Sequence, residues 1–481
     1  MPITHASAFC PPPSSIADWA RAEFGHAELG DDRRTERLLM IATAFADQPT
    51  AAIPQACGPG APTQGAYRFF ENDDLDPAAI RDAHEQATWA RVRQQPIVLA
   101  AQDTSTLNYT THPRTAGLGP IGTRQQTLLG LLLHSTLALT PSGQPLGLLH
   151  TAVRARDPHS AGVARHRHQR ATADKETQKW LDSLSACQAL AAECPKTLVV
   201  NVTDREGDCY ALFAQAQAAP ADAYAHLLVR SRHNRQRVDA APPLWAHIGR
   251  RRGAGQLKVR VGRRGEQPAR LATLTIRFGP VTLAAPQRQA GQPPLHLWAI
   301  EAREPRPPAG VPPIVWRLLT TLPVTTLAEA CEKVGWYAQR WQIEVIHKVL
   351  KSGCHIEQRQ LQTAARLARA LAVDQVVAWR ILALVKAGRE QPDAPVSAWL
   401  EQAEWEALWC QVHQAPTPPG TPPTVRQAMR WLAQLGGFLG RKGDGAPGPL
   451  TLGRGLQRLH DLTAMWRLCH RKKGVKNCAQ G

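Results

Sequence analysis

Two apolar, strand-like segments that each run into an aspartate constrain the fold of this chain more than any other feature. Residues 96–108 (PIVLAAQDTSTLN) begin apolar and turn polar at Asp103. Residues 196–202 (KTLVVNV) form a short continuous apolar run, typical of a strand in the middle of a sheet, and lead directly into Asp204. If these strands are neighbours, the two carboxylates converge at one edge of the sheet.

The segments around these strands predict an α/β fold with a mixed sheet. Residues 128–139 and 146–153 are two more strand candidates, joined by the turn sequence Thr140-Pro141-Ser142-Gly143. Residues 174–190 have a helical pattern that Asp174 can cap. The resulting order of strand, strand, strand, helix, strand, helix suits a mixed sheet covered by helices.

The chain is long enough for two or three domains, with 481 residues of which 43% are hydrophobic. Helical patterns predict a first domain over residues 1–78 and a last domain over residues 391–481. Residues 79–390 between them contain the mixed sheet, with a β-rich insertion around residues 230–315. Candidate N-caps of the first two helices are Ser14 or Ser15 and Asp31 or Asp32.

The chain is strongly basic, with a formal net charge of +18. Dispersed Lys and Arg in this excess predict a polyanionic partner, and nucleic acid fits better than a local patch of anionic lipid. A genome that favours basic, Arg-rich proteins would also produce such a composition. Arg33, Arg34 and Arg37 stand at the start of the second helix, where the helix dipole favours anions. These three side chains therefore face either a DNA phosphate or solvent.

The sequence indicates neither a disulfide scaffold nor a membrane anchor. The ten cysteines include no CxxC pair and no short spacing to paired histidines, which predicts a reducing, cytosolic environment. His159, His166 and His168 lie in an Arg-rich segment that has the pattern of a solvated basic loop, with a metal cluster as the weaker alternative. Residues 1–15 lack the pattern of a secretion signal, and the apolar run over residues 127–139 is too short to span a bilayer.

A third acidic residue, Glu344, has the sharpest context. Tyr337, Arg340, Glu344 and Lys351 follow one another in steps of three, four and seven residues, within and just beyond the apolar-periodic residues 334–350. On one regular helix these side chains fall within an arc of about 60°. A stripe of phenol, guanidinium, carboxylate and ammonium is a poor core face and a good surface for a phosphate held beside a metal ion.

Asp103, Asp204 and Glu344 together predict a site for two divalent metal ions. Carboxylate oxygens are hard ligands that select Mg²⁺ or Mn²⁺ over zinc. Two such ions can activate the attacking oxygen and stabilise the leaving oxygen during displacement at phosphorus. Each acid also has an ordinary structural interpretation, namely Asp103 as a turn former, Asp204 as a helix cap and Glu344 as an ion-pair partner of Arg340 or Lys348.

Several separate motifs resemble those of one family, in the order that the family has them. They are Gly65-Ala66-Tyr67-Arg68-Phe69, Gln102-Asp103-Thr104-Ser105, Asp204-Arg205-Glu206-Gly207-Asp208 and Arg340-Trp341-Gln342-Ile343-Glu344. From near Asp18 to near Leu459 the chain resembles a DDE transposase of insertion-sequence family four, the cut-and-paste group that includes the Tn-five transposase. Its YREK signature is matched, with the spacing intact, by Tyr337, Arg340, Glu344 and Lys351.

The resemblance implies an RNase H-like catalytic core. Asp103, Asp204 and Glu344 would be its catalytic carboxylates and would bind two Mg²⁺ ions, for which Mn²⁺ can substitute. Gly207 departs from the family pattern because it stands where Ala is more usual. Val345 also departs from it, since a second acid often follows the catalytic glutamate. Neither departure touches the three expected ligands.

The resemblance also implies a set of DNA contacts near the scissile phosphate. Contacts with the DNA backbone are expected from Tyr337, Arg340, Lys351 and Arg230. Trp316 lies where the family has an aromatic side chain that stacks on a base flipped out during hairpin formation. The alternative is that Trp316 is a buried aromatic in the strand over residues 314–319, because aromatic side chains are common in strands.

The function implied by the resemblance is that of a bacterial, nucleoid-associated cut-and-paste transposase. Such an enzyme cleaves the ends of its element through hairpin intermediates and joins the 3′ hydroxyls to target DNA. Its partners would be double-stranded DNA, both transposon ends and target, and a second copy of the chain in a homodimeric synaptic complex. Residues 1–78 would bind the element's ends, and residues 391–481, including Gly436-Gly437-Phe438, would form the dimer.

Two other functions stay open at the level of the sequence. The chain could be a catalytically inactive, transposase-derived DNA-binding repressor, because a single buried defect can abolish activity without changing a motif. It could also be a metal-dependent nuclease that cuts DNA without strand transfer. In each case the affinity for DNA is expected to fall steeply as the salt concentration rises.

Overall fold

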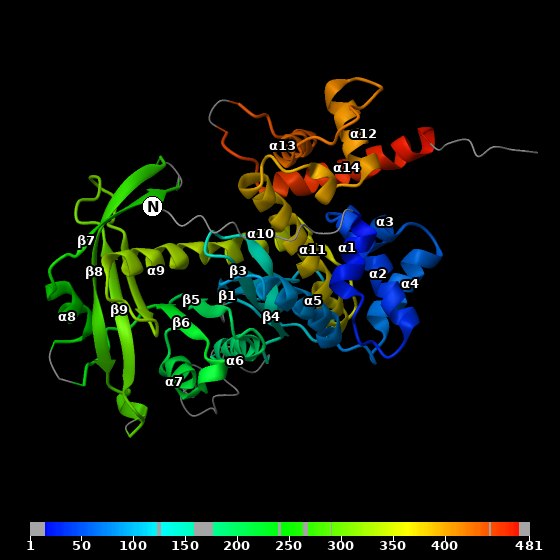
Figure 1. Ribbon diagram of the computed structural model, residues 1–481. Coiled ribbons are helices and arrows are strands. Elements are labelled where there is room, and N and C mark those ends of the chain that lie inside the picture. The colour runs from blue at the N-terminus through cyan, green and yellow to red at the C-terminus, as the bar shows by residue number, and fades with distance from the viewer. Residues whose placement is uncertain are drawn as a thin grey trace, which may run out of the picture. The chain divides into compact units, whose positions relative to one another are not determined.

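The computed structural model describes residues 15–122, 127–157, 177–238, 242–262, 268–289, 291–441 and 444–470. The chain forms two compact units (Figure 1). The first contains Thr88–Thr106 and Gly119–Glu344. The second contains residues 15–87, Leu107–Leu118 and the chain that follows Glu344. The three candidate catalytic carboxylates therefore belong to the first unit.

A mixed sheet forms the centre of the first unit (Figure 1). Its strands follow the order β2-β3-β1-β5-β6-β10-β9-β8-β7, and β4 pairs with β3. Strands β1, β5 and β6 are parallel, whereas β3 with β4 and all pairs from β6 to β7 are antiparallel. The strands are β1 (Ile97–Asn108), β2 (Gly119–Pro120), β3 (Leu129–Leu139), β4 (Pro145–Arg154), β5 (Leu198–Thr203), β6 (His226–Arg230), β7 (Gly255–Val261), β8 (Arg270–Leu283), β9 (Leu295–Arg303) and β10 (Val315–Thr320).

Part of this sheet has the topology of an RNase H-like core. The order β4-β3-β1-β5-β6 places β1 in the middle, with an antiparallel pair on one side and two parallel strands on the other. The apolar run that predicted a strand in the middle of the sheet is β5, the direct neighbour of β1. The predicted fold class, with a mixed sheet flanked by helices, is therefore confirmed.

Helices cover this core and supply much of its apolar surface. Helix α6 (Gln178–Glu193) packs against β4 and β5, and α7 (Tyr210–Ala218) packs against β6 and β9. Trp180 from α6 and Phe213 from α7 are buried in one cluster with Val199 of β5. Burial of large apolar side chains of this kind contributes about 1.5–3 kcal/mol each, so the contacts of both helices fix the strands that carry the acidic residues.

The strands predicted over residues 96–108, 128–139, 146–153, 196–202 and 314–319 are present as β1, β3, β4, β5 and β10, with ends that differ by a few residues. Strand β9 was not predicted, because the charged residue Glu301 interrupts its apolar pattern. The structure buries Glu301 and pairs it with arginines of two neighbouring strands, Arg277 at 3.6 Å and Arg317 at 3.1 Å. The proposed cap Asp174 lies outside the described residues, as do His159, His166 and His168.

The second unit is helical both in its N-terminal segment and in the chain that follows Glu344. Its first two helices have the caps that the sequence offers, since the Ser15 hydroxyl accepts from the Asp18 N–H at 2.9 Å and the Asp31 carboxylate accepts from the Arg33 N–H at 2.8 Å. Helices α5 and α10 begin in one unit and end in the other. The helices, including these two, are α1 (Ile16–Phe24), α2 (Asp32–Asp47), α3 (Ile53–Cys57), α4 (Ala61–Glu71), α5 (Pro77–Val92), α10 (Trp341–Ser352), α11 (Ala364–Glu390), α12 (Gln402–His413), α13 (Val425–Leu435) and α14 (Pro449–Cys469).

Helix α11 is the centre of the second unit and is buried almost from end to end. Its Asp374 carboxylate accepts hydrogen bonds from the Arg359 guanidinium at 2.7 and 3.1 Å, and both side chains are buried. None of the helices in the described part of the chain has the length and apolar character that crossing a membrane requires. The cysteines in that part are all free, namely Cys57, Cys187, Cys194, Cys209, Cys331, Cys354, Cys410 and Cys469.

Candidate active site

Asp103 and Asp204 lie at the same edge of the sheet, as the strand pattern predicted. Strands β1 and β5 are parallel, and their last paired residues are Ala101 and Val202. Each aspartate follows its paired residue by two positions, so the two carboxylates extend beyond the paired ladder on the same face. Asp103 lies within β1, which continues to Asn108, whereas Asp204 follows the last residue of β5.

The structure excludes two of the ordinary interpretations of the acids. Asp103 lies inside a strand and not in a turn. Asp204 does not cap a helix, because the residue at the N-cap of α7 is Cys209. The Asp204 carboxylate instead accepts a hydrogen bond from the Glu206 N–H at 2.8 Å, which closes a short turn. The ion pair between Glu344 and Arg340 is present.

The guanidinium of Arg340 lies between two of the three acids. Its Nη1 is 3.6 Å from Oδ2 of Asp103, and its Nη2 donates a hydrogen bond to Oε1 of Glu344. The Arg340 side chain is 12% exposed and that of Asp103 is 21% exposed, whereas that of Glu344 is 56% exposed. The largely buried guanidinium of Arg340 therefore contacts Asp103 of the sheet on one side and Glu344 of a helix on the other.

The three carboxylates share one electrostatic environment. The pKa of Asp103 is raised to about 6, mainly by burial and to a smaller extent by the nearby charges of Asp204 and Glu344. Arg340 and the backbone N–H of Thr104 act in the opposite direction, because both favour the ionised carboxylate. A cation near Asp103 would therefore stabilise its ionised form.

The helix that carries Glu344 differs from the prediction. Helix α9 (Leu327–Gln339) ends before Arg340, and α10 begins at Trp341. The prediction of one regular helix is therefore wrong at Arg340, where the N–H bonds to the Tyr337 carbonyl and the carbonyl accepts from the Ile343 N–H. This tighter turn aims the Arg340 side chain at the sheet edge. Lys351 lies in the last turn of α10 and belongs to the second unit.

The residues at this site suit a hard divalent cation, but they do not form a ready ligand cage. Among the described residues, no three acidic, histidine or cysteine side chains are close enough together to hold a metal ion. Arg340 instead supplies the positive charge that contacts Asp103 and Glu344. Because carboxylate oxygens are the preferred ligands of Mg²⁺ and Mn²⁺, the donor set fits these ions in its chemistry.

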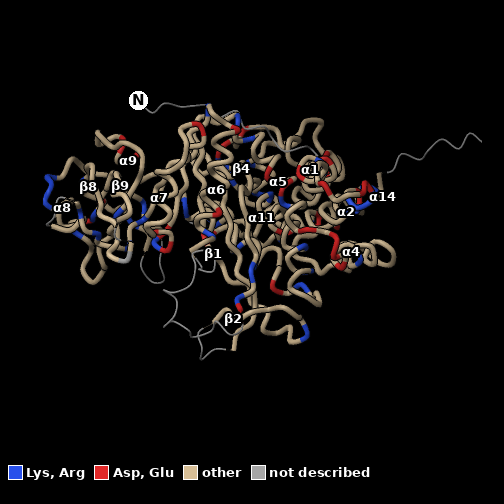
Figure 2. Tube along the Cα trace, turned by 90° about the horizontal axis from the view of Figure 1, so that it is seen from below, with Lys and Arg blue, Asp and Glu red and all other residues tan. Residues whose placement is uncertain are grey.

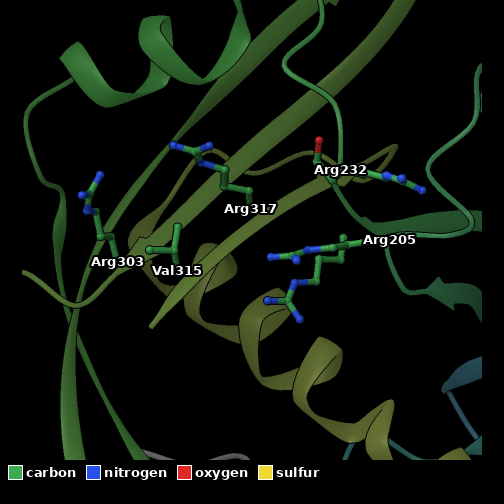
Figure 3. A pocket seen from close by; sticks show the side chains of 7 residues that line it. Arg205, Arg232, Arg303, Val315 and Arg317 are labelled. Atoms are coloured by element: carbon green, nitrogen blue, oxygen red, sulfur yellow. The ribbon is translucent and has the colours of Figure 1, made fainter. Parts of the chain in front are cut away.

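A basic pocket of about 470 Å³ lies beside the turn that follows Asp204 (Figure 3). Figure 3 shows the side chains that line it, which come from that turn, from the end of β6 and from strands β9 and β10. Figure 2 shows that Lys and Arg are dispersed over the chain as a whole, so this gathering around one cavity is a local feature. The lining residues are Arg205, Arg230, Ser231, Arg232, Arg303, Val315 and Arg317.

Most of the positive charge in this pocket is not neutralised by the protein. Arg317 pairs with Glu301 at 3.1 Å. Within the described part of the chain, no carboxylate lies within ion-pair distance of the other arginines that line the pocket. The Nε of Arg230 is buried and has no hydrogen-bond partner among the described residues. A pocket of this kind stabilises an anion with several acceptor oxygens, such as a phosphodiester.

Asp208 holds the loop that forms one wall of the basic pocket, a role that the sequence did not predict. Its side chain is fully buried and pairs with Arg235 at 2.5 Å. Its Oδ2 accepts from the backbone N–H of Arg232 at 2.6 Å and of His233 at 3.0 Å. The signal that could have revealed this role is the position of Asp208 four residues after Asp204, close enough to serve the same site from the other end of the turn.

Trp316 is placed on β10 with its ring against Tyr337. The two ring centroids are 5.8 Å apart and the rings meet edge to face. Tyr337 is buried, at 5% exposure, whereas Trp316 is only partly buried. The contact gives Trp316 a packing role, and the residue is not closed off from solvent. Both interpretations of this residue therefore stay open.

The arginines at the start of α2 differ from one another. The Arg34 guanidinium donates to the Leu29 carbonyl at 3.1 Å and pairs with Asp74 at 3.3 Å. The guanidinium of Arg37 packs over Gly65, so closely that a side-chain carbon at Gly65 would lie 2.5 Å from its Nη1. Arg33 is exposed. Of the three, Arg33 is the one whose side chain is most accessible to an external phosphate.

Comparisons with known proteins match the chain to transposase family models. Family models match the chain in three successive parts: transposase DNA-binding over residues 16–75, transposase DDE domain over residues 149–373, and transposase Tn5 dimerisation domain over residues 376–470. The DDE match includes Asp204 and Glu344, and Asp103 precedes it. Among solved structures, a cryo-EM structure of a piggyBac transposase synaptic complex with hairpin DNA aligns with 97% of this chain and 84% of that chain, at 8% identity and a TM-score of 0.37.

Proposed function

The chain belongs to the DDE transposases, with the domain set of the Tn5 type, and from this we propose that it is a cut-and-paste transposase. It binds the ends of its own element, cleaves them through hairpin intermediates and joins the free 3′ hydroxyls to target DNA. The observation that carries the proposal is the contact of Arg340 with Asp103 and Glu344, with Asp204 near enough to affect the pKa of Asp103. Beside the turn that follows Asp204 lies a pocket in which most of the arginines have no carboxylate partner among the described residues.

We assign the catalytic and metal-binding roles to the three carboxylates. Asp103, Asp204 and Glu344 would hold two Mg²⁺ ions, and Mn²⁺ would substitute for them. Bound there, such ions activate the attacking oxygen and stabilise the leaving one. The protein's own contribution is to fix the two aspartates just beyond the paired ladder of two adjacent strands and to neutralise phosphate charge with Arg340.

The DNA backbone is proposed to lie along the basic pocket. Arg230 contributes a buried Nε–H that has no hydrogen-bond partner among the described residues, and Arg205 extends from the turn that directly follows Asp204. A phosphate in the pocket would thus contact Arg205, the residue that directly follows Asp204 in the sequence. Further contacts are proposed from Tyr337, Arg340, Lys351, Trp316, Arg33, Arg34 and Arg37.

Recognition of element ends and dimer formation are proposed for the two helical ends of the chain, residues 1–78 and 391–481. These assignments are supported by the matches to transposase DNA-binding and dimerisation models. Gly436 itself serves packing within the chain, because a side-chain carbon there would lie 1.9 Å from the Thr451 carbonyl oxygen of α14. We therefore place the dimer contact on the exposed side of α14, where Met465 and Leu468 are 59% and 61% exposed.

The direct test is cleavage of DNA that carries the terminal repeats flanking the coding region. Purified full-length protein with Mg²⁺ should nick this DNA, form hairpins and produce joined products with a target plasmid. Asp204→Ala should abolish all three products and retain binding to the terminal repeats. Normal cleavage by Asp204→Ala would remove the catalytic assignment.

The same experiment separates the two alternative functions. A transposase-derived repressor would bind the terminal repeats equally well with and without the three carboxylates and would yield no cleavage. A nuclease without strand transfer would degrade DNA in the presence of Mg²⁺ and never produce joined molecules. The intact set of acids in one unit favours the transposase over the repressor, because negative charges beside a DNA-binding pocket repel the DNA backbone unless metal ions neutralise them.

A further inference from the structure

A hydrogen-bonded network of polar side chains lies behind the catalytic aspartates, on the opposite face of the sheet. Gln102 and Thr104 flank Asp103 in β1, so their side chains point away from the side that Asp103 faces. Both contact His134 on the neighbouring strand β3. Gln102 also contacts Asn201 on β5, the strand that ends just before Asp204. Gln102 and Asn201 are fully buried, and His134 is 2% exposed.

The donors and acceptors of this network match one another. The Gln102 Nε2 donates to Asn201 Oδ1 at 2.6 Å, which leaves Gln102 Oε1 facing His134 Nε2 at 3.0 Å. His134 Nδ1 lies 2.9 Å from the Thr104 hydroxyl. A neutral imidazole with its proton on Nε2 satisfies both contacts, since Nε2–H donates to Gln102 and Nδ1 accepts from Thr104.

The network continues into α6, the helix that covers this face of the sheet. Asn201 Nδ2 donates to the Cys187 thiol of α6 at 3.3 Å. The His134 ring also meets the ring of Trp180 on α6, edge to face, with centroids 4.8 Å apart. His134 is thus held by two strands and one helix, and its imidazole has little freedom to move.

The position of this network along the strands affects the geometry of the candidate catalytic site. The paired ladder between β1 and β5 ends at Ala101 and Val202, two residues before each aspartate. The bond from Gln102 to Asn201 is therefore a side-chain connection between the two strands at the point where backbone pairing stops. His134 fixes the orientation of Gln102 and, through Thr104, holds β1 on the far side of Asp103.

We propose that His134 is a positioning residue for the metal site, which sets the separation of Asp103 and Asp204 by orienting Gln102 and Thr104. The inference rests on the proposed function. An apolar side chain in place of His134 would fill the same space, but it would leave buried polar atoms of Gln102 and Thr104 without partners. Networks of this kind are retained where geometry matters, because a fully bonded set has one low-energy arrangement.

The test is the affinity of the full-length, DNA-free protein for Mn²⁺, measured by electron paramagnetic resonance at pH 8. His134→Phe keeps an aromatic ring against Trp180 and removes both hydrogen bonds. We expect this variant to bind Mn²⁺ about tenfold more weakly, at the low end of what the loss of a supporting contact costs a metal site. Thr104→Val, which keeps the shape and the backbone N–H and loses only the hydroxyl, should weaken binding severalfold in the same direction.

The matched control is Thr136→Val. Thr136 lies two residues beyond His134 on β3, is also buried, and bonds to Ser183 of α6 at 2.6 Å without touching a neighbour of Asp103. It should lose a similar amount of stability in thermal unfolding and keep wild-type Mn²⁺ affinity. If His134→Phe and Thr136→Val have the same Mn²⁺ affinity, His134 is only a structural residue and the inference is overturned.

Two further outcomes are distinguishable. If His134→Phe does not fold, Thr104→Val decides, and wild-type Mn²⁺ affinity in that variant would overturn the inference. If the wild-type protein itself neither binds Mn²⁺ nor cleaves terminal-repeat DNA, the proposed function fails, and the positioning role fails with it. If only the positioning role fails, the wild-type protein still binds Mn²⁺ and cleaves terminal-repeat DNA.

Discussion

The Nη1 atom of Arg340 lies 3.6 Å from Oδ2 of Asp103. The same guanidinium donates to Glu344, so a positive side chain neutralises two of the three carboxylates assigned to metal binding. This relationship makes Arg340 both a helper for phosphate binding and a competitor for the metal ligands. The two roles predict opposite effects of one substitution.

We expect Arg340→Ala to bind Mn²⁺ severalfold more tightly than the wild-type protein in the absence of DNA, because the carboxylate oxygens lose their competing cation. The same variant should lose DNA cleavage by about 10²-fold or more, since it no longer neutralises the phosphate. Isothermal titration at pH 8, where Asp103 stays ionised, measures the first effect. Arg303→Ala is the control, because Arg303 lines the basic pocket away from the carboxylates. Weaker Mn²⁺ binding by Arg340→Ala would contradict the prediction.

The raised pKa of Asp103, about 6, predicts a pH dependence of both stability and metal binding. The folded-state pKa lies above the ordinary value of 3.8, so the folded protein binds more protons than the unfolded chain between about pH 4 and pH 6. Stability of the metal-free protein therefore decreases as the pH rises through this range. Metal affinity changes in the opposite direction, because only the ionised carboxylate is a ligand.

Asp103→Asn tests the sign of this effect. The variant should be more stable than the wild-type protein at pH 8 by on the order of 2 kcal/mol, and the gain should disappear as the pH falls towards 4. Thermal unfolding of the metal-free proteins across this pH range measures the difference. A gain that is independent of pH would show that burial of the Asp103 charge is not its cause.

Gly207 is predicted to be required by its neighbour Thr203. A side-chain carbon at Gly207 would lie 2.6 Å from the Thr203 hydroxyl and 2.8 Å from its Cβ, which is closer than atoms in real structures approach. Gly207→Ala should therefore destabilise the protein by about 1–3 kcal/mol and reduce cleavage by displacing the turn that begins at Asp204. The double variant Thr203→Ala with Gly207→Ala should recover most of both losses. Additive effects in thermal unfolding would show that the two residues do not interact.

Asp208 is predicted to connect protein stability with DNA affinity. Asp208→Ala leaves Arg235 without its buried partner and releases the N–H groups of Arg232 and His233, at a cost of about 3–5 kcal/mol. Because the released loop contributes to the basic pocket, the salt dependence of DNA binding should also become shallower. Asp182→Ala is the control, since it removes a partly exposed ion pair with Arg154 and should cost under about 1 kcal/mol. Unchanged salt dependence in Asp208→Ala would separate the loop from DNA binding.

Trp316→Ala distinguishes the two interpretations of that side chain. If the ring stacks on a flipped base, the variant should form the first nick at nearly the wild-type rate and form hairpins at least about tenfold more slowly, because stacking contributes about 1–3 kcal/mol per base. Single-turnover cleavage of terminal-repeat DNA resolves the two steps. An equal loss in both steps, together with a lower melting temperature, would assign Trp316 to packing against Tyr337.

Local patterns in the sequence were sufficient to predict most of the core. The apolar run before Asp204 predicted a buried strand, which is present as β5. Ser15 and Asp31 cap the first two helices because their side chains accept hydrogen bonds from N–H groups two or three residues on. Such signals depend on neighbours within one element. Strand β9 was missed because the burial of Glu301 depends on arginines of other strands.

The sequence by itself determined which acidic residues are candidates for the site and that two of them follow apolar, strand-like runs. Only the tertiary structure decided that Arg340 stands between Asp103 and Glu344, that Asp208 anchors a wall of the basic pocket, and that His134 connects the strands behind the aspartates. These contacts join residues that are far apart along the chain. Their energies depend on which segments meet after folding, and no local period or spacing carries that information.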